Sequence, residues 1–327
     1  MKNYRSFLQN NYLTSISKAP GKIILFGEHF VVHGNRAILG AINKYATVTS
    51  EKTNTNNILI SSSLGQASIE KDEDVSNVEK KFRPFFYIAK EIISKNNFEN
   101  GISIKIESDI PIGAGLGSSS ACCVAAAASV SNLFNNTNEK EILDLSIQAE
   151  KTIFPNSSGA DCTVSVHGGI IEYQKEKGFL KIETENEFNF LIIDSEQVHA
   201  TDKVVEQVKK FKDENSDIFS ELCSEEERLV TKALESMKSN DLETMGKCMA
   251  QNQIYLEQIG VSNDILLSIT KEIEQITFGA KITGAGGGGC IIALTQKNND
   301  LSEFMNTTKY QTHNVSIQKT GMQVFNR

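Results

Sequence analysis

The chain has 327 residues, with 33 Lys and Arg against 41 Asp and Glu, a formal net charge of −8 and 39% hydrophobic residues. This composition is ordinary for a folded globular protein, and the length predicts two domains of about 150 residues each. It excludes a disordered, collagen-like or small disulfide-stabilised chain. The acidic balance argues against nucleic acid or an anionic membrane as a partner, because such binding needs clustered Lys and Arg.

The longest nearly apolar stretch, residues 121–130, is far shorter than the roughly 20 residues that a membrane span needs. Residues 1–17 mix charged and amide side chains with single apolar ones, so they lack the apolar core of a secretory signal. We therefore expect a cytoplasmic protein with no membrane partner. The six cysteines form no C-x2-C pair, which predicts reduced, structural thiols.

Strand-like and glycine-rich segments alternate in the first half of the chain. Strands are expected at 22–26, 45–49, 102–106 and 170–173. A helix rich in small residues is expected from about Ser118 to Leu133. A second helix should start near Asn138, whose spacing to Glu141 is typical of a capping box, and end before Pro155.

The second half has longer helices. The charged stretch 174–187 is the expected domain junction, which predicts an N-terminal domain at 1–178 and a C-terminal domain at 179–327. Amphipathic patterns predict helices at about 201–213, 217–238, 240–258 and 263–277, and strands are expected at 190–193, 290–294, 315–317 and near 324. Strands and helices in both halves, without a regular β-α-β alternation, favour an α+β fold. The helices at 217–258 could equally form a homodimer face or part of the core.

The clearest local motif is the glycine loop at 111–120, which follows a predicted strand and opens the small-residue helix. Its sequence is Pro111-Ile-Gly113-Ala114-Gly115-Leu116-Gly117-Ser118-Ser119-Ser120. Glycines let the backbone approach a ligand closely, and a helix N-terminus offers free N–H groups, so the loop is predicted to hold phosphate. It is not a Walker A loop, because no Lys precedes the serines. The alternative is a purely structural turn.

A second cluster, Gly284-Ala285-Gly286-Gly287-Gly288-Gly289, lies directly before an apolar strand. Ordering five glycines has a large entropic cost, so a simple linker is a poor explanation. The alternative to ligand binding is a tight turn that lets two loops pack closely.

Charged residues near these loops are candidates for chemistry. Lys22 starts a predicted strand and is followed by Glu28 and His29, whose spacing does not match the H-E-x-x-H zinc motif. Glu150 lies near the end of its helix, where a bound cation would relieve the unfavourable helix dipole. Asp161 lies in a turn-rich stretch before an expected apolar strand. Considered singly, each of these residues could be an ordinary surface or turn residue.

Taken together, these segments resemble the galactokinase, homoserine kinase, mevalonate kinase and phosphomevalonate kinase (GHMP) superfamily. Its three motifs occur in order, at Ala19–His29, Pro111–Ala121 and Lys281–Gly289. Within the superfamily, Gly27-Glu28-His29 with His33-Gly34, and the stretch 252–262, are similar to mevalonate kinases of archaeal type.

The resemblance implies a two-domain α+β fold, with an N-terminal domain like ribosomal protein S5 domain 2, a ferredoxin-like C-terminal domain and the active site between them. It implies Asp161 as catalytic base, Lys22 as its partner, Ser119 and Glu150 as Mg²⁺ ligands, and Glu28, His29 and Thr201 on the substrate side. The glycine motifs would bind ATP through Pro111, Gly113, Ala114, Gly115, Leu116, Gly117, Ser118, Ser119, Ser120, Ala121, Gly284, Ala285 and Gly286. One departure is the turn 155–161, which lacks the His-Gly start usual in the family.

The implied reaction is phosphoryl transfer from ATP to the primary hydroxyl of mevalonate, with ATP and mevalonate as the partners. Other GHMP enzymes remain alternatives: kinases of phosphomevalonate, a sugar or homoserine, and the mevalonate-diphosphate decarboxylase. Phosphorylated substrates should need more local Arg or Lys than Lys18, Lys22 and Arg36 supply. A nucleotide-binding regulator without turnover is the alternative from a different class, although a regulator has no need of a base such as Asp161.

Overall fold

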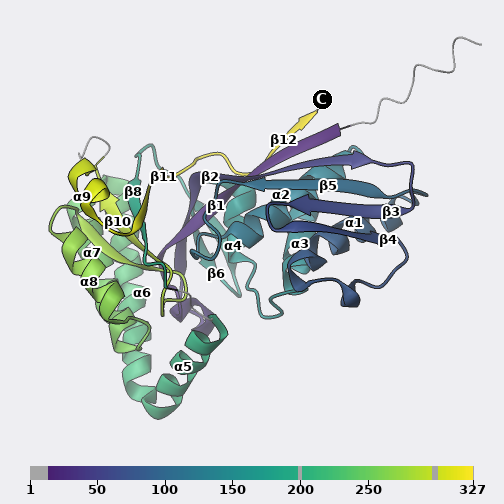
Figure 1. The fold of residues 1–327 in the computed structure, drawn as a ribbon. Helices are drawn as coiled ribbons and strands as arrows, with labels where there is room; N and C mark the ends of the chain where they lie inside the picture. Colours follow the sequence, from purple (N-terminus) through teal and green to yellow (C-terminus); the bar gives the residue numbers. More distant parts are fainter. Residues whose placement is uncertain (1–13, 198–200, 297–300, 327) are drawn as a thin grey trace, which may run out of the picture.

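The computed structural model describes residues 14–197, 201–296 and 301–326. In these ranges the chain forms two sheets, each with its own set of helices (Figure 1). Strands and helices mix in both halves, so the predicted α+β class is confirmed. No helix within the described ranges is long and apolar enough to span a bilayer.

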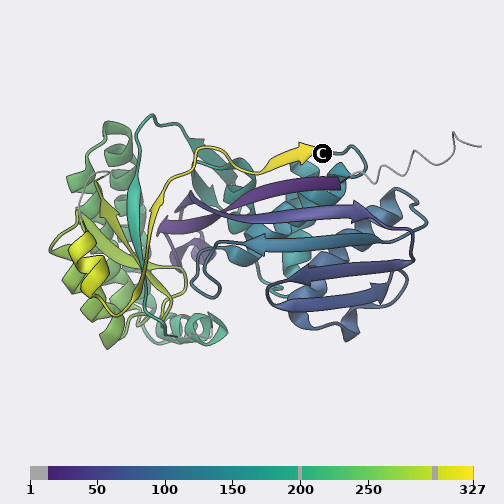
Figure 2. The same cartoon turned by 45° about the horizontal axis from the view of Figure 1, so that its top comes forward.

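The larger sheet has the strand order β12-β1-β2-β5-β3-β4, and β6 and β7 extend it from β2. Neighbouring strands run antiparallel except β3 and β5, which pair in parallel. Figure 2 shows β12 lying beside β1, so the last described strand returns to the sheet that the first one began. The strands are β1 (Thr14–Phe26), β2 (Ala37–Lys52), β3 (Asn57–Ser62), β4 (Gly65–Glu70), β5 (Ile102–Ser108), β6 (Ile170–Gln174), β7 (Gly178–Ile182) and β12 (Gln323–Asn326).

Helices cover one face of this sheet (Figure 1). They are α1 (Arg83–Lys95), α2 (Ser118–Asn132), α3 (Glu139–Lys151) and α4 (Ala160–His167), with short 3-10 turns η1 (Phe30–His33), η2 (Val75–Asn77) and η3 (Lys80–Phe82). The alanines of α2 are buried, and their small size lets the Ser17 hydroxyl of β1 donate to the Ala125 carbonyl. The side chain of Asn138 accepts from the backbone N–H of Glu141 at 3.1 Å, which confirms the predicted N-cap.

The second sheet has the order β11-β8-β10-β9 and is antiparallel throughout. Its strands are β8 (Asn189–Asp194), β9 (Gly279–Thr283), β10 (Cys290–Thr295) and β11 (Gln311–Ser316). All six residues of β10 are buried, as its apolar sequence predicts. The accompanying helices are α5 (Thr201–Glu214), α6 (Ser216–Ser239), α7 (Leu242–Gln258), α8 (Asp264–Glu274) and α9 (Ser302–Thr307).

One local expectation is wrong. The apolar segment after Asp161 is the helix α4 and not a strand. Its alternating Cys162, Val164 and Val166 imitate a strand, but the intervening Thr163 and Ser165 are buried as well, with hydroxyls that donate to main-chain carbonyls. Burial on every side removes the polar face that normally reveals a helical period.

The charged stretch 174–187, expected as a junction, contains β7, which pairs with β6. The division of the chain into two domains after residue 178 stays a prediction. The C-terminal strand β12 pairs with β1, so it belongs to the larger sheet and not to the second one.

Candidate active site

The structure brings Lys22 and Asp161 together although 138 residues separate them in the chain. Lys22 lies in β1 with 5% of its side chain exposed, and its Nζ is 3.2 Å from Asp161 Oδ2. Asp161 is in the first turn of α4 and has 33% of its side chain exposed. A carboxylate at a helix N-terminus is favoured by the helix dipole. The pair therefore presents an anion to solvent with a cation held directly beside it.

The first glycine loop lies against this pair. Gly113, Gly115 and Gly117 all have φ between 73° and 77°, a left-handed region that glycine adopts without strain. A Cβ at Gly117 would lie 2.7 Å from Lys22 Cγ, so the glycine makes room for the lysine stem. The backbone N–H of Lys22 donates to the Leu116 carbonyl at 2.9 Å, which fixes the loop to β1.

The side chains of Ala114, Leu116, Ser120 and Ala121 are buried, whereas Pro111, Ser118 and Ser119 are half-buried. Buried apolar residues of the loop can thus reach a ligand only through their main chain. A loop of this kind that leads into the N-terminus of α2 has the arrangement that holds phosphate groups elsewhere.

The second glycine cluster meets the first loop at Gly284. A Cβ at Gly284 would lie 3.8 Å from the Cα of Gly115, which is ordinary contact. Farther along, a Cβ at Gly286 or Gly288 would come within 2.4 Å of a backbone carbonyl oxygen, that of Val261 or Gln197. Close loop packing therefore explains the later glycines, while Gly284 and Ala285 border the first loop and His29.

Glu150 is 5% exposed at the end of α3. Its carboxylate accepts from the hydroxyls of Ser120 and, at 2.5 Å, Ser157. Burial raises the pKa of Glu150, and the nearby Asp161 raises it further. The hydroxyl that reaches Glu150 is that of Ser120, next to the expected Ser119.

Oxygen donors such as these suit Mg²⁺, which binds proteins through one or two carboxylates and completes its shell with water and substrate phosphates. Among the described residues, His, Cys, Asp and Glu side chains form no group of three or more that could hold a metal ion by themselves. The residues present fit a metal whose other ligands come from a bound nucleotide.

Glu28 and His29 are nearly buried, each 7% exposed. Glu28 Oε1 accepts from Lys281 Nζ, and the two side chains are 1% and 0% exposed. His29 Nε2 lies 2.7 Å from the Ala285 carbonyl oxygen. Burial raises the pKa of Glu28 and lowers those of His29 and Lys281. Thr201, the remaining substrate-side expectation, is the first residue of α5, and its side chain lies outside the described residues.

Three polar residues that sequence reasoning gave no role lie around Glu28. Lys281 is its ion-pair partner, and Glu226 of α6 accepts from the Gly27 N–H at 2.9 Å and from Asn252 Nδ2 at 2.7 Å. A signal for Glu226 exists in the sequence, because Leu222, Glu226 and Leu229 fall at the spacing of one buried helix face. A glutamate on such a face indicates a buried polar contact.

Family models agree with the fold and the site. The model described as "GHMP kinases N terminal domain" matches residues 84–169, and "GHMP kinases C terminal" matches residues 233–308. Together with the glycine loop and the Lys22–Asp161 pair, they define a kinase of the GHMP class.

Individual relatives identify one family within this class of kinases. A mevalonate kinase from Archaeoglobus fulgidus is 32% identical over 293 residues, covering 89% of this chain and 95% of that protein. The crystal structure of the Methanococcus jannaschii mevalonate kinase has a TM-score of 0.82 at 30% identity and covers 95% and 99% of the two chains. The crystal structure of the L. major mevalonate kinase in complex with R-mevalonate shares the fold. It has a TM-score of 0.80 at 24% identity and covers 93% of this chain and 96% of that chain. The chain belongs to the mevalonate kinase family.

Proposed function

We propose that the chain is an ATP-dependent mevalonate kinase, which phosphorylates the primary 5-hydroxyl of (R)-mevalonate to give 5-phosphomevalonate. The observation that carries the proposal is the Lys22–Asp161 pair, 3.2 Å apart beside the glycine loop. Its relatives carry the name mevalonate kinase, and one structural neighbour is titled as a complex with R-mevalonate. ATP and mevalonate are the proposed partners, and the cytoplasm is the proposed location.

Asp161 is the proposed catalytic base. Its partly exposed carboxylate accepts the proton of the substrate hydroxyl as the hydroxyl oxygen attacks the terminal phosphate. Lys22, 3.2 Å from this carboxylate, attracts the negative charge that develops on the attacking oxygen. The N–H groups of the glycine loop and of the first turn of α2 orient the phosphates.

Glu150 and Ser119 are the proposed Mg²⁺ ligands, and the Ser120 and Ser157 hydroxyls orient the Glu150 carboxylate. When bound, the ion neutralises phosphate charge and fixes the phosphate chain. For Glu28, the buried ion pair with Lys281 supports an indirect role in shaping the substrate side, since its carboxylate faces Lys281 and not solvent. The contact between His29 Nε2 and the Ala285 carbonyl oxygen supports the same indirect role for His29.

The test is an ADP-release assay with Mg²⁺ and ATP on mevalonate, phosphomevalonate, galactose and homoserine, with the product's phosphate position read by phosphorus NMR. Turnover of mevalonate at its primary hydroxyl is the expected result. Asp161→Asn should reduce kcat at least about 100-fold, within the range of a lost general base, while ATP binding is retained. Activity on another alcohol alone would refute the substrate, and unchanged turnover in Asp161→Asn would refute the base.

A further inference from the structure

The segment from Gly27 to Arg36 carries Glu28 and His29 and lies on one face of α6. Five residues of α6 contact it: Phe219, Cys223, Glu226, Glu227 and Thr231. Their spacing of three and four residues places them on one side of the helix. A helix from the other half of the chain therefore holds the segment at both ends and at Phe30.

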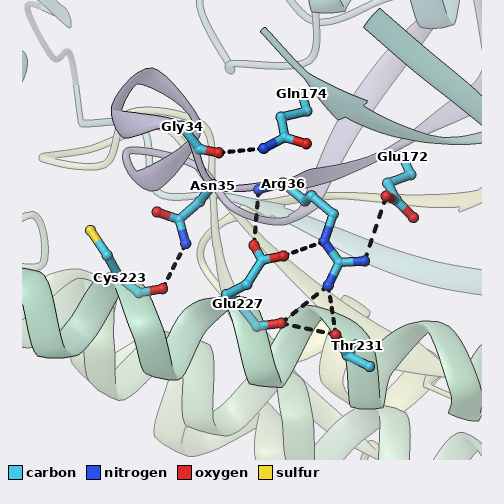
Figure 3. Close-up of polar contacts among 8 residues, drawn as sticks. All are labelled: Gly34, Asn35, Arg36, Glu172, Gln174, Cys223, Glu227 and Thr231. Carbon is cyan, nitrogen blue, oxygen red and sulfur yellow. Dashed lines mark hydrogen bonds and ion pairs between the residues drawn. The ribbon is translucent and has the colours of Figure 1, made fainter. Parts of the chain in front are cut away.

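Both ends of the segment are fixed by hydrogen bonds. At the first end, Gly27 N–H donates to Glu226 at 2.9 Å. At the second end, Asn35 Nδ2 donates to the Cys223 carbonyl at 2.6 Å, and the Arg36 N–H donates to Glu227 at 3.2 Å. Figure 3 shows this second end, with the residues around Gly34 lying above α6. Between the ends, Phe30 of η1 stacks on Phe219 with ring centroids 6.0 Å apart.

Arg36 is the most highly connected group in this contact (Figure 3). Its Nε donates to Glu227 Oε1 at 2.5 Å, and its guanidinium also reaches Thr231 at 2.6 Å and Glu172 of β6 at 3.5 Å. The Arg36 side chain is 19% exposed and that of Glu227 is 42% exposed, so solvent screens the pair and it adds little to stability. A guanidinium with several fixed acceptors does, however, determine position and orientation.

The two ends of the segment also lie against each other. Gly27 has φ 93°, and a Cβ there would be 2.5 Å from the Arg36 carbonyl oxygen. A displacement of Arg36 is therefore passed directly to Gly27, the residue before Glu28. On the other side of the segment, Glu28 contacts Lys281 and His29 contacts the Ala285 carbonyl, so these two residues are held from both sides.

We propose that Glu226 and Glu227 of α6, acting with Arg36, are positioning residues that set the place of Glu28 and His29 and thereby the affinity for the alcohol substrate. This inference rests on the proposed function for its substrate. Glu226 holds the first end from a fully buried position, and Glu227 with Arg36 holds the second end from a partly exposed one. Neither glutamate touches the Lys22–Asp161 pair, so the expected effect is on binding of the alcohol and not on the chemical step.

The decisive variant is Glu227→Ala in the full chain, because the Glu227 side chain is 42% exposed and is not part of the buried core. Its matched control is Arg228→Ala, which removes a pair with Glu225 on the same helix whose side chains are 73% and 39% exposed. Glu227→Gln keeps one oxygen acceptor for Arg36, so its KM for mevalonate should lie between those of the wild type and Glu227→Ala. The measurements are KM for mevalonate, KM for ATP, kcat, and hydrogen–deuterium exchange of peptides covering 27–36 and 113–121.

For Glu227→Ala we expect KM for mevalonate to rise about three- to tenfold, below the roughly 100-fold loss that a 1 Å misplacement of reacting groups can cause. KM for ATP and kcat should stay within about twofold, and exchange should rise in 27–36 but not in 113–121. Unchanged exchange in 27–36, or an equal rise in both KM values, overturns the inference. If the wild-type protein does not turn over mevalonate, the proposed function fails, while the exchange result still decides whether α6 positions the segment.

Discussion

Replacing the buried Lys281 tests how the two halves of the chain are held together at the substrate side. Its side chain is 0% exposed, its partner Glu28 is 1% exposed, and its Nζ also donates to the Ile282 carbonyl at 2.7 Å. Lys281→Met preserves the apolar stem but removes the charge, leaving Glu28 as an uncompensated buried carboxylate. Breaking a buried ion pair in this way costs about 3–5 kcal/mol.

The loss of stability in Lys281→Met should depend on pH. Burial already raises the pKa of Glu28, and loss of Lys281 raises it further. A folded-state pKa above the unfolded value gives stability that is present at low pH and is lost as pH rises through the folded value. The destabilisation should therefore be smaller at pH 5.5 than at pH 8.

Urea unfolding followed by circular dichroism at both pH values measures the effect. The matched control is Lys105→Met, whose pair with Glu107 at 2.9 Å joins side chains 60% and 58% exposed and should contribute at most about 1 kcal/mol. The double variant Lys281→Met with Glu28→Gln should recover part of the loss, because no buried charge is then left unpaired. A loss in Lys281→Met equal to that in Lys105→Met, or one independent of pH, would refute the reasoning.

Three further predictions concern other buried groups. Burial, followed by the Glu28 charge, raises the pKa of Glu226 from 4.5 to about 7. Wild-type stability should therefore fall as pH rises from about 4.5 to about 7, and Glu226→Gln should flatten that slope in urea midpoints; an unaltered slope contradicts the assignment. Glu150→Gln should raise the Mg²⁺ concentration for half-maximal activity by at least about tenfold, and an unchanged Mg²⁺ titration would remove Glu150 from the metal site. Cys162 is fully buried, and this burial raises the pKa of its thiol well above the usual value, so it should react with a disulfide reagent at pH 8 only after unfolding, and rapid reaction of Cys162 in the native protein counts against the buried packing.

Elements with a strong period or a strong local signal could be predicted from the sequence. The α2 helix and its preceding glycine loop follow from residue types alone, since glycine allows left-handed backbone and alanine allows close packing. The cap of α3 follows from Asn138 and Glu141 for the same local reason. The segment at α4 could not be predicted, because burial on all sides hid its helical period.

Within the site, the sequence by itself determined the candidate groups: a lysine, a histidine, three acidic residues and two glycine loops. Only the tertiary structure decided which groups meet. Lys22 with Asp161, and Glu28 with Lys281, are pairs from distant parts of the chain, and a charged side chain leaves no periodic trace of its partner in the sequence. The same holds for Glu226, whose place on the buried face of α6 is visible in the spacing but whose bond to Gly27 is not. Local backbone preferences act within a few residues, whereas these contacts form only when elements far apart in the chain pack together and bring their polar groups out of water.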